Sequence, residues 1–203
     1  TLGTASLIAP AARSQGVSIE TATDAQKKEA QAQYERGAKA FDAKQYEDAL
    51  AAFSSSYSIV RSPNAHMMMA RALMQLGRCP RADNELVVVE QEAAGLAKYA
   101  QTLDRAKELR AECAGKVALV TVFVKGEPGI VPTITVGEIA AKPETAVAVD
   151  PGKIRVVVKA AGYQNQKEIS VLAGQSELVE LRVGPDPNPL ASATVAPATS
   201  AQG

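Results

Sequence analysis

The stretch that decides the fold is residues 34–53, YERGAKAFDAKQYEDALAAF, which has a partner 33 positions later in residues 67–86, MMMARALMQLGRCPRADNEL. At this offset small residues meet small ones and the larger apolar positions remain apolar: Gly37 with Ala70, Tyr46 with Cys79, Ala49 with Ala82, Phe53 with Leu86. A helix pair that cannot bury its own apolar face must stack on a copy of itself, and a period in the low thirties is typical of such helical repeats.

The helical pattern extends around this repeat and predicts about five helices. Thr23 and Gln26 have the spacing of a capping box at the first start, and Ser62-Pro63 is typical of a helix N-cap followed by the first helical residue. The valine run 87–89 favours a strand by propensity, but the repeat places it in a helix. The predicted helices cover residues 24–43, 46–60, 63–77, 80–93 and 96–113.

Gly37, Tyr46, Ala49 and Phe53 resemble the small-residue and aromatic skeleton of the tetratricopeptide (TPR) repeat, from which the second copy departs at Ala70 and Cys79. In that family the first helix of each repeat lines a concave groove that binds a peptide or partner helix. The resemblance therefore implies a groove lined by Tyr34, Phe41, Asn64, Met67, Arg71 and Gln75. Arg71 is the single charged residue of this set, which departs from the carboxylate-clamp pattern of the family.

After Gly115 the apolar period changes from helical to alternating, which predicts an antiparallel β-sandwich of six or seven strands. Asp150-Pro151-Gly152-Lys153 and Ala161-Gly162-Tyr163 resemble the second half of the PEGA-type β domain. The expected fold is α+β in two domains, a short TPR-like α-solenoid followed by the sandwich. The expected parts are a tail at 1–20, a helical domain at 21–114, a β domain at 116–183 and a disordered tail or linker at 184–203.

The composition disfavours several functional classes. Basic and acidic residues number 22 each and Trp is absent, which does not favour a nucleic-acid partner. With His66 as its single histidine, the chain has neither a catalytic triad nor a His-rich metal centre to offer. His66 and the neighbouring residues 67–69, all Met, could be a soft metal site, but packing is the favoured interpretation. We therefore expect a non-enzymatic protein with no catalytic residue, no cofactor and no metal site.

Two features indicate export. Residues 9–11 (Ala-Pro-Ala) and 12–14 (Ala-Arg-Ser) fit the small-x-small cleavage pattern of a secretory signal, with an N-terminal tail as the alternative. Cys79 opens the fourth predicted helix and Cys113 closes the fifth, so antiparallel packing would bring them together. We expect a disulfide between them, which suits a periplasmic or secreted protein; the alternative is two separate buried thiols.

The first hypothesis for function is an exported interaction protein that binds a peptide or another protein through its helical repeats, with the β domain as a second binding module or spacer. Helical repeats followed by such a β domain resemble envelope proteins of delta-proteobacteria, which implies an indirect association with the cell envelope. A structural scaffold or stalk without a dedicated ligand is the alternative. Peptidoglycan or carbohydrate binding by the β domain is a weaker one.

Overall fold

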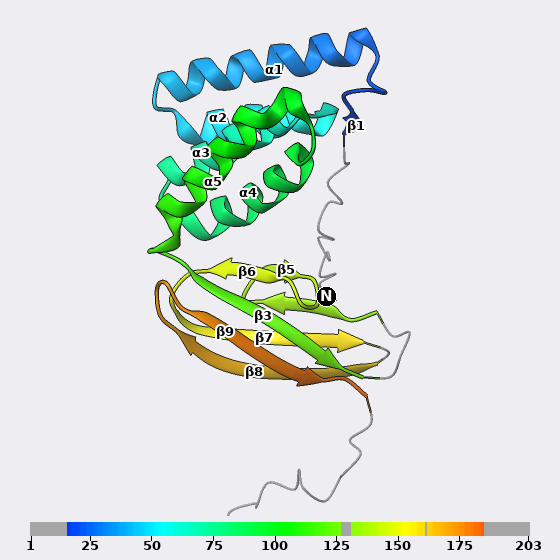
Figure 1. The fold of residues 1–203 in the computed structure, drawn as a ribbon, viewed down its shortest axis with the longest axis vertical. Helices are drawn as coiled ribbons and strands as arrows, with labels where there is room; N and C mark the ends of the chain where they lie inside the picture. Colours follow the sequence, from blue (N-terminus) through cyan, green and yellow to red (C-terminus); the bar gives the residue numbers. More distant parts are fainter. Residues whose placement is uncertain (1–15, 127–130, 161, 185–203) are drawn as a thin grey trace, which may run out of the picture. The chain divides into compact units, whose positions relative to one another are not determined.

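The computed structural model describes residues 16–126, 131–160 and 162–184, and confirms a two-part α+β layout with helices first and strands after them (Figure 1). The packing of the helices as a solenoid and of the sheets as a sandwich remains a prediction. The helices are α1 (Asp24–Asp42), α2 (Tyr46–Ile59), α3 (Pro63–Gln75), α4 (Cys79–Ala93), the 3-10 helix η1 (Ala97–Tyr99) and α5 (Ala100–Ala114).

The helix boundaries follow local signals in the sequence. Thr23 and Gln26 form the predicted capping box, each side chain bonding to the backbone of the other residue. Gly77, just beyond α3, has a φ of +73°, a left-handed conformation that glycine adopts without a steric penalty. Ser62 precedes Pro63 as predicted, but its side chain makes no capping hydrogen bond. The valine run 87–89 is helical, as the repeat predicts.

The 33-residue repeat defines the helical core. Ala49 and Ala82 are fully buried, and so are Phe53 and Leu86. Phe53 lies between α1 and α2, where the Tyr34 ring meets it edge-on at 5.3 Å between centroids. Ser56 Oγ donates a buried hydrogen bond to the carbonyl oxygen of Ala30 at 2.8 Å, so α2 is fixed to α1 by both apolar and polar contacts.

A short parallel pairing, which the sequence pattern does not predict, precedes the helices. Strand β1 (Val17–Ser18) pairs with β2 (Val60–Arg61), with Val17 opposite Val60. The predicted N-terminal tail therefore contains two strand residues. A two-residue parallel bridge has no periodic pattern in sequence, because its partner is more than 40 positions away. The cleavage pattern at residues 9–14 lies outside the described residues.

The strands of the β-rich region form two sheets. Their bounds are β3 (Ala118–Lys125), β4 (Thr133–Val136), β5 (Ile139–Ala141), β6 (Ala146–Val149), β7 (Gly152–Ala160), β8 (Tyr163–Val171) and β9 (Ser176–Arg182). One sheet has the order β6-β3-β9 and the other β5-β4-β7-β8. Strand β4 is antiparallel to both its neighbours, and buried Ile134 lies opposite buried Val158.

The chain divides into two compact units. The first comprises Thr1–Leu119, Ala148–Gly152 and Val171–Ser176, and the second comprises Val120–Val147, Lys153–Ser170 and Glu177–Gly203. The predicted tail at 184–203 lies outside the described residues except for Gly184. Within the described ranges, no helix has both the length and the apolar character that crossing a membrane requires.

Gly37 should be the least replaceable position of α1. A Cβ at this position would lie 2.7 Å from two carbon atoms of the fully buried Phe53 ring. Alanine normally stabilises a helix by about 1 kcal/mol over glycine, but overpacking a core costs about 1–3 kcal/mol. We expect Gly37→Ala to lower the free energy of unfolding by up to about 2 kcal/mol, the overpacking cost less the helix-propensity gain, measured by urea denaturation.

The control for this substitution is Gly115→Ala. Gly115 has a φ of −77°, and a Cβ added there would have no atom within 4 Å outside its immediate chain neighbours, so its replacement should leave stability unchanged or slightly raised. Equal effects of the two substitutions would contradict the close approach of α1 and α2.

Candidate functional site

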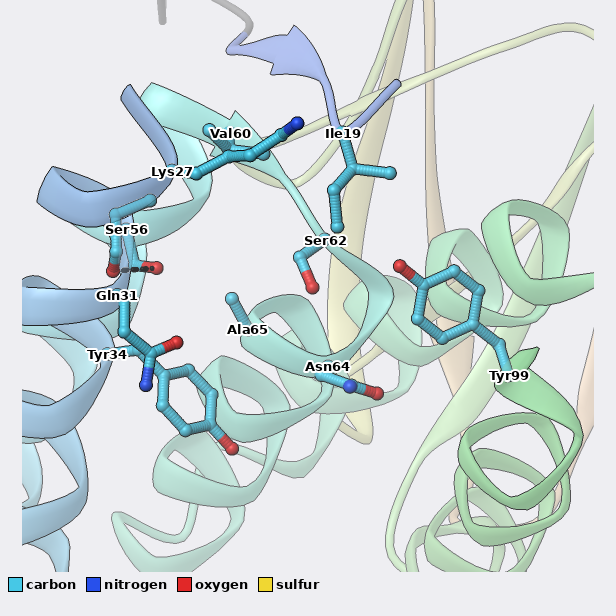
Figure 2. Close-up of a pocket in the computed structure, with 11 residues that line it drawn as sticks. Ile19, Lys27, Gln31, Tyr34, Ser56, Val60, Ser62, Asn64, Ala65 and Tyr99 are labelled. Carbon is cyan, nitrogen blue, oxygen red and sulfur yellow. Dashed lines mark hydrogen bonds between the residues drawn. The ribbon is translucent and has the colours of Figure 1, made fainter. Parts of the chain in front are cut away.

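The candidate site is a groove of about 430 Å³ in the helical unit, between the N-terminal half of α1 and the start of α3 (Figure 2). This volume is within the usual range of ligand pockets, about 300–1,000 Å³. We call it the α1–α3 groove. It is lined by Ile19, Lys27, Ala30, Gln31, Tyr34, Ser56, Val60, Ser62, Asn64, Ala65 and Tyr99.

The groove has an apolar base. Ala30 and Val60 belong to a buried cluster against which Ile19 packs. The pairing of β1 with β2 brings Ile19 to this place, because the chain passes directly from Ser18 into the groove wall. An apolar base of this kind favours a ligand that buries a small aliphatic side chain.

The polar groups of the groove come from three separate segments. Lys27 and Gln31 are one turn apart on α1, Ser62 and Asn64 belong to the start of α3, and Tyr99 ends η1. Thr102 Oγ1 donates to Asn64 Oδ1 at 2.6 Å, which leaves the Asn64 amide nitrogen as the end able to donate elsewhere. Among the described residues that line the groove, Lys27 is the one with a formal charge.

Two of the six residues predicted to bind a partner lie in this groove. Tyr34 contributes to the lining from α1 and Asn64 from α3. Tyr34 also contacts the Phe53 ring, so it is shared between the groove and the core. The structure thus brings together one aromatic and one amide side chain that the TPR resemblance implied would face the same groove.

The other four predicted residues lie elsewhere. The Arg71 guanidinium stacks over the Phe41 ring at 5.0 Å and donates to the Met68 sulfur at 3.2 Å. Met67 packs on a buried cluster that includes Leu86 and Leu109. Gln75, the last residue of α3, is exposed. Arg71, Phe41 and Met67 therefore already have partners inside the protein.

Several groove residues are not predicted by the sequence. Ile19 falls in the segment expected to be a tail, and Tyr99 in a segment expected to be regular helix. Lys27 and Gln31 follow the helical pattern of α1, but nothing in that pattern separates them from other exposed polar residues. Lys27 and Gln31 are four positions apart and therefore lie on the same face of α1. This spacing, together with the helix start at Ser62-Pro63, is the signal that could have indicated them.

A second polar cluster surrounds His66, which is buried in α3. Its Nε2 lies 2.7 Å from Glu85 Oε2, and its Nδ1 lies 3.2 Å from Glu92 Oε2. Tyr57 Oη donates to the other oxygen of Glu92, and the Tyr57 and His66 rings are 4.4 Å apart. The cluster links α2, α3 and α4. Both ring nitrogens of the single histidine are therefore engaged with carboxylates.

The electrostatics of this cluster favour a charged histidine. Burial lowers the pKa of His66, but the hydrogen bonds and charges of Glu85 and Glu92 outweigh burial and raise this pKa to about 9. For Glu92, burial raises the pKa and the hydrogen bonds from His66 and Tyr57 lower it further than that, so the net direction is down. Burial, followed by the bond to Glu92, raises the pKa of Tyr57. His66 is thus an internal cation held by two carboxylates.

The structure brings the two cysteines together, as the packing argument expects. Cys79 and Cys113 are both buried free thiols, and burial together with a hydrogen bond to Cys79 raises the pKa of the Cys113 thiol to about 12. The disulfide itself remains a prediction. Among the described residues, no cluster of three or more His, Cys, Asp or Glu side chains has the arrangement of a metal site.

The His66 cluster should make stability fall with rising pH. The folded-state pKa of about 9 is above the ordinary 6.5, so the stabilisation is complete below pH 6.5 and is lost as the pH rises towards 9. At about 1.4 kcal/mol per pKa unit, we expect unfolding by urea to become easier by roughly 2 kcal/mol between pH 6 and pH 8.5.

The control is His66→Gln, which removes the titrating group and leaves two carboxylates facing an uncharged amide. This variant should be less stable than the parent at pH 6 by roughly 2–4 kcal/mol and should lose most of the difference between the two pH values. An equal pH dependence of parent and variant would contradict a charged His66.

The disulfide can be measured directly. We expect protein purified without reductant to contain the Cys79–Cys113 bond, seen as a mass about 2 Da below the reduced form and as no reactive thiol in denaturant. Closing a loop of this size should contribute roughly 3–4 kcal/mol to the free energy of unfolding. Cys79→Ser, which prevents the bond, serves as the control. Two thiols titrating in the denatured, never-reduced protein would exclude it.

The comparisons with known proteins give no assignment: no protein-family model matches the chain, and no curated protein matches it. The TPR and PEGA resemblances therefore rest on short residue patterns of the sequence alone.

Proposed function

We propose that this protein is a non-enzymatic, exported interaction module whose helical repeats hold an extended segment of a peptide or partner protein in the α1–α3 groove. The observation that carries the proposal is the groove itself, about 430 Å³ with an apolar base and hydrogen-bonding walls. Pockets that combine apolar surface with a few convergent polar groups are the usual form of a ligand site.

The chemistry of the groove supports a peptide as its ligand. A peptide offers alternating backbone N–H and C=O groups and small apolar side chains. The walls present the amides of Gln31 and Asn64 and the hydroxyls of Ser62 and Tyr99, while Ala30 and Val60 supply the apolar base. A short groove with these partners supports a modest affinity, on the order of micromolar.

The cellular location belongs to the same proposal. The predicted disulfide between the neighbouring buried side chains of Cys79 and Cys113 would suit an oxidising compartment, in which the protein would be periplasmic or secreted and associate indirectly with the envelope. The β-rich region would act as a second binding module or as a spacer. Tyr163, at the start of β8, is a partly exposed aromatic that such a module could use.

A scaffold without a dedicated ligand is the second candidate, and one observation favours it. Arg71 is the charged side chain that the repeat pattern implied for partner binding, yet it stacks on Phe41 and bonds to Met68. These internal contacts fill the end of α3 that lies away from Ser62. Under the scaffold hypothesis the residues implied for recognition stabilise the fold and no partner depends on the groove.

The two candidates can be separated with one matched pair of variants. Gln31→Arg places a long side chain on the groove wall, and an Arg at this position can keep the contact that the Gln31 amide makes with Glu35 at 2.9 Å. Ala32→Arg puts the same side chain on the neighbouring exposed residue, which does not line the groove. In affinity purification from envelope extract, we expect a partner retained by the parent protein to be lost with Gln31→Arg, at least tenfold by quantitative mass spectrometry, and kept with Ala32→Arg.

A third variant, Arg71→Glu, tests the Phe41 end of α3. Because Arg71 is engaged with Phe41 and Met68, we expect this variant to lose thermal stability and still retain the partner. Loss of the partner with Arg71→Glu but not with Gln31→Arg would move the binding site to the Phe41 end. Retention of every co-purifying protein by all three variants would support the scaffold.

A further inference from the structure

We infer that the exposed face of the sheet β5-β4-β7-β8 binds an acidic polysaccharide, a linear chain of sugars that carry carboxylates. This face, which we call the basic face, is centred on Lys153, Arg155 and Lys159 of β7. All three residues belong to the second compact unit. The inference therefore goes beyond the α1–α3 groove and does not depend on it.

The alternation of β7 places its three cations on one face of the sheet. Val156 and Val158 are fully buried, whereas Lys153, Arg155 and Lys159 are exposed. Successive side chains of a strand point to opposite faces, so the cations share the face opposite to the buried valines. At about 3.4 Å per residue they form a row about 20 Å long.

The charges of this row are not neutralised within the described part of the chain. None of the three cations makes an ion pair there, and Glu168 is the one acidic residue at the exposed-face positions of β4, β7 and β8. Lys153 and Arg155 are two positions apart, so their like charges repel across about 7 Å. On the other sheet, by contrast, Lys125 is paired with Glu180 at 2.7 Å. A bound anion would relieve the repulsion along β7.

Hydrogen-bonding side chains flank the row on both neighbouring strands. On β4, Thr133 lies directly opposite Lys159, and Thr135 points to the same face two residues later. On β8, Gln164 and Gln166 are exposed and alternate towards this face. Hydroxyl and amide groups both donate and accept hydrogen bonds, which suits the hydroxyls of sugars. Carboxylates in turn suit the row of cations, because charge-assisted hydrogen bonds are the stronger ones.

The make-up of the basic face favours a polysaccharide over other polyanions. At the exposed-face positions of β4, β7 and β8, no large apolar side chain is exposed. The face therefore offers nothing to insert into a bilayer and no aromatic ring on which the bases of a single-stranded nucleic acid could stack. The chain as a whole has 22 basic and 22 acidic residues, which is not the balance of a protein that binds duplex nucleic acid.

The test uses the full chain and oligogalacturonate, a linear probe with one carboxylate on each sugar, in isothermal titration calorimetry. Its methyl ester is the matched control, because it keeps the sugar chain and removes the charges. We expect the acid to bind at least about tenfold more tightly than the ester at low salt, and to bind more weakly as salt screens the charges. Phosphatidylglycerol vesicles and a DNA duplex should both bind more weakly than the acid.

Three variants assign the contact to the basic face. Arg155→Gln should weaken oligogalacturonate about threefold or more, because it removes the middle charge of the row. Lys125→Gln removes the same charge from an exposed residue of the other sheet and should leave binding unchanged. Glu168→Gln removes the acidic group of the face, so it should tighten binding about twofold.

The possible outcomes are distinct. Equal binding of the acid and the ester, or no binding of either, would overturn the inference. Tighter binding to the vesicles or to the duplex than to oligogalacturonate would overturn it as well, and so would equal effects of Arg155→Gln and Lys125→Gln. None of these results bears on the Gln31→Arg and Ala32→Arg comparison, which tests the α1–α3 groove separately.

Discussion

The close approach of the Gly37 backbone to the Phe53 ring is the constraint on which the helical unit depends. Without a side chain on Gly37, the ring fills the space between α1 and α2 and is itself fully buried. Both α1 and α3 pack on α2, so the distance between α1 and α3 depends on where each of them contacts α2. Two helices that pack on a third without packing on each other leave a channel between them, and the α1–α3 groove is such a channel.

The same logic explains why the polar end of the groove lies at the start of α3. The chain leaves α2 through β2, whose pairing with β1 holds residues 60 and 61 extended. Pro63 then begins the helix without an N–H of its own, and Ser62 does not cap the next ones. The N-terminus of α3, which carries the positive end of the helix dipole, therefore lies at the groove, and no side chain of Ser62 caps its first N–H groups.

The sequence predicted the elements and core residues that follow a periodic pattern, but not the groove residues that lie outside such a pattern. The 33-residue offset correctly put the valine run of α4 in a helix and identified Ala49, Phe53 and their repeat partners as core. It could not place Tyr99 or Ile19 in the groove, because they lie in short irregular segments with no repeat. It also gave no means to distinguish an Arg71 that faces a partner from one that stacks on Phe41, since both satisfy the same helical position.

The two ends of α3 therefore differ in how much of their interaction capacity the protein uses itself. At the C-terminal half, the Arg71 charge is stacked on Phe41 and its donor reaches Met68, so another molecule binding there would have to displace contacts that already exist. At the N-terminal end, the Lys27 charge, the Tyr99 hydroxyl and two backbone N–H groups have no partner among the described residues. A molecule that bound there would replace water and not protein contacts, so the lower cost favours the N-terminal end as the site for the proposed partner.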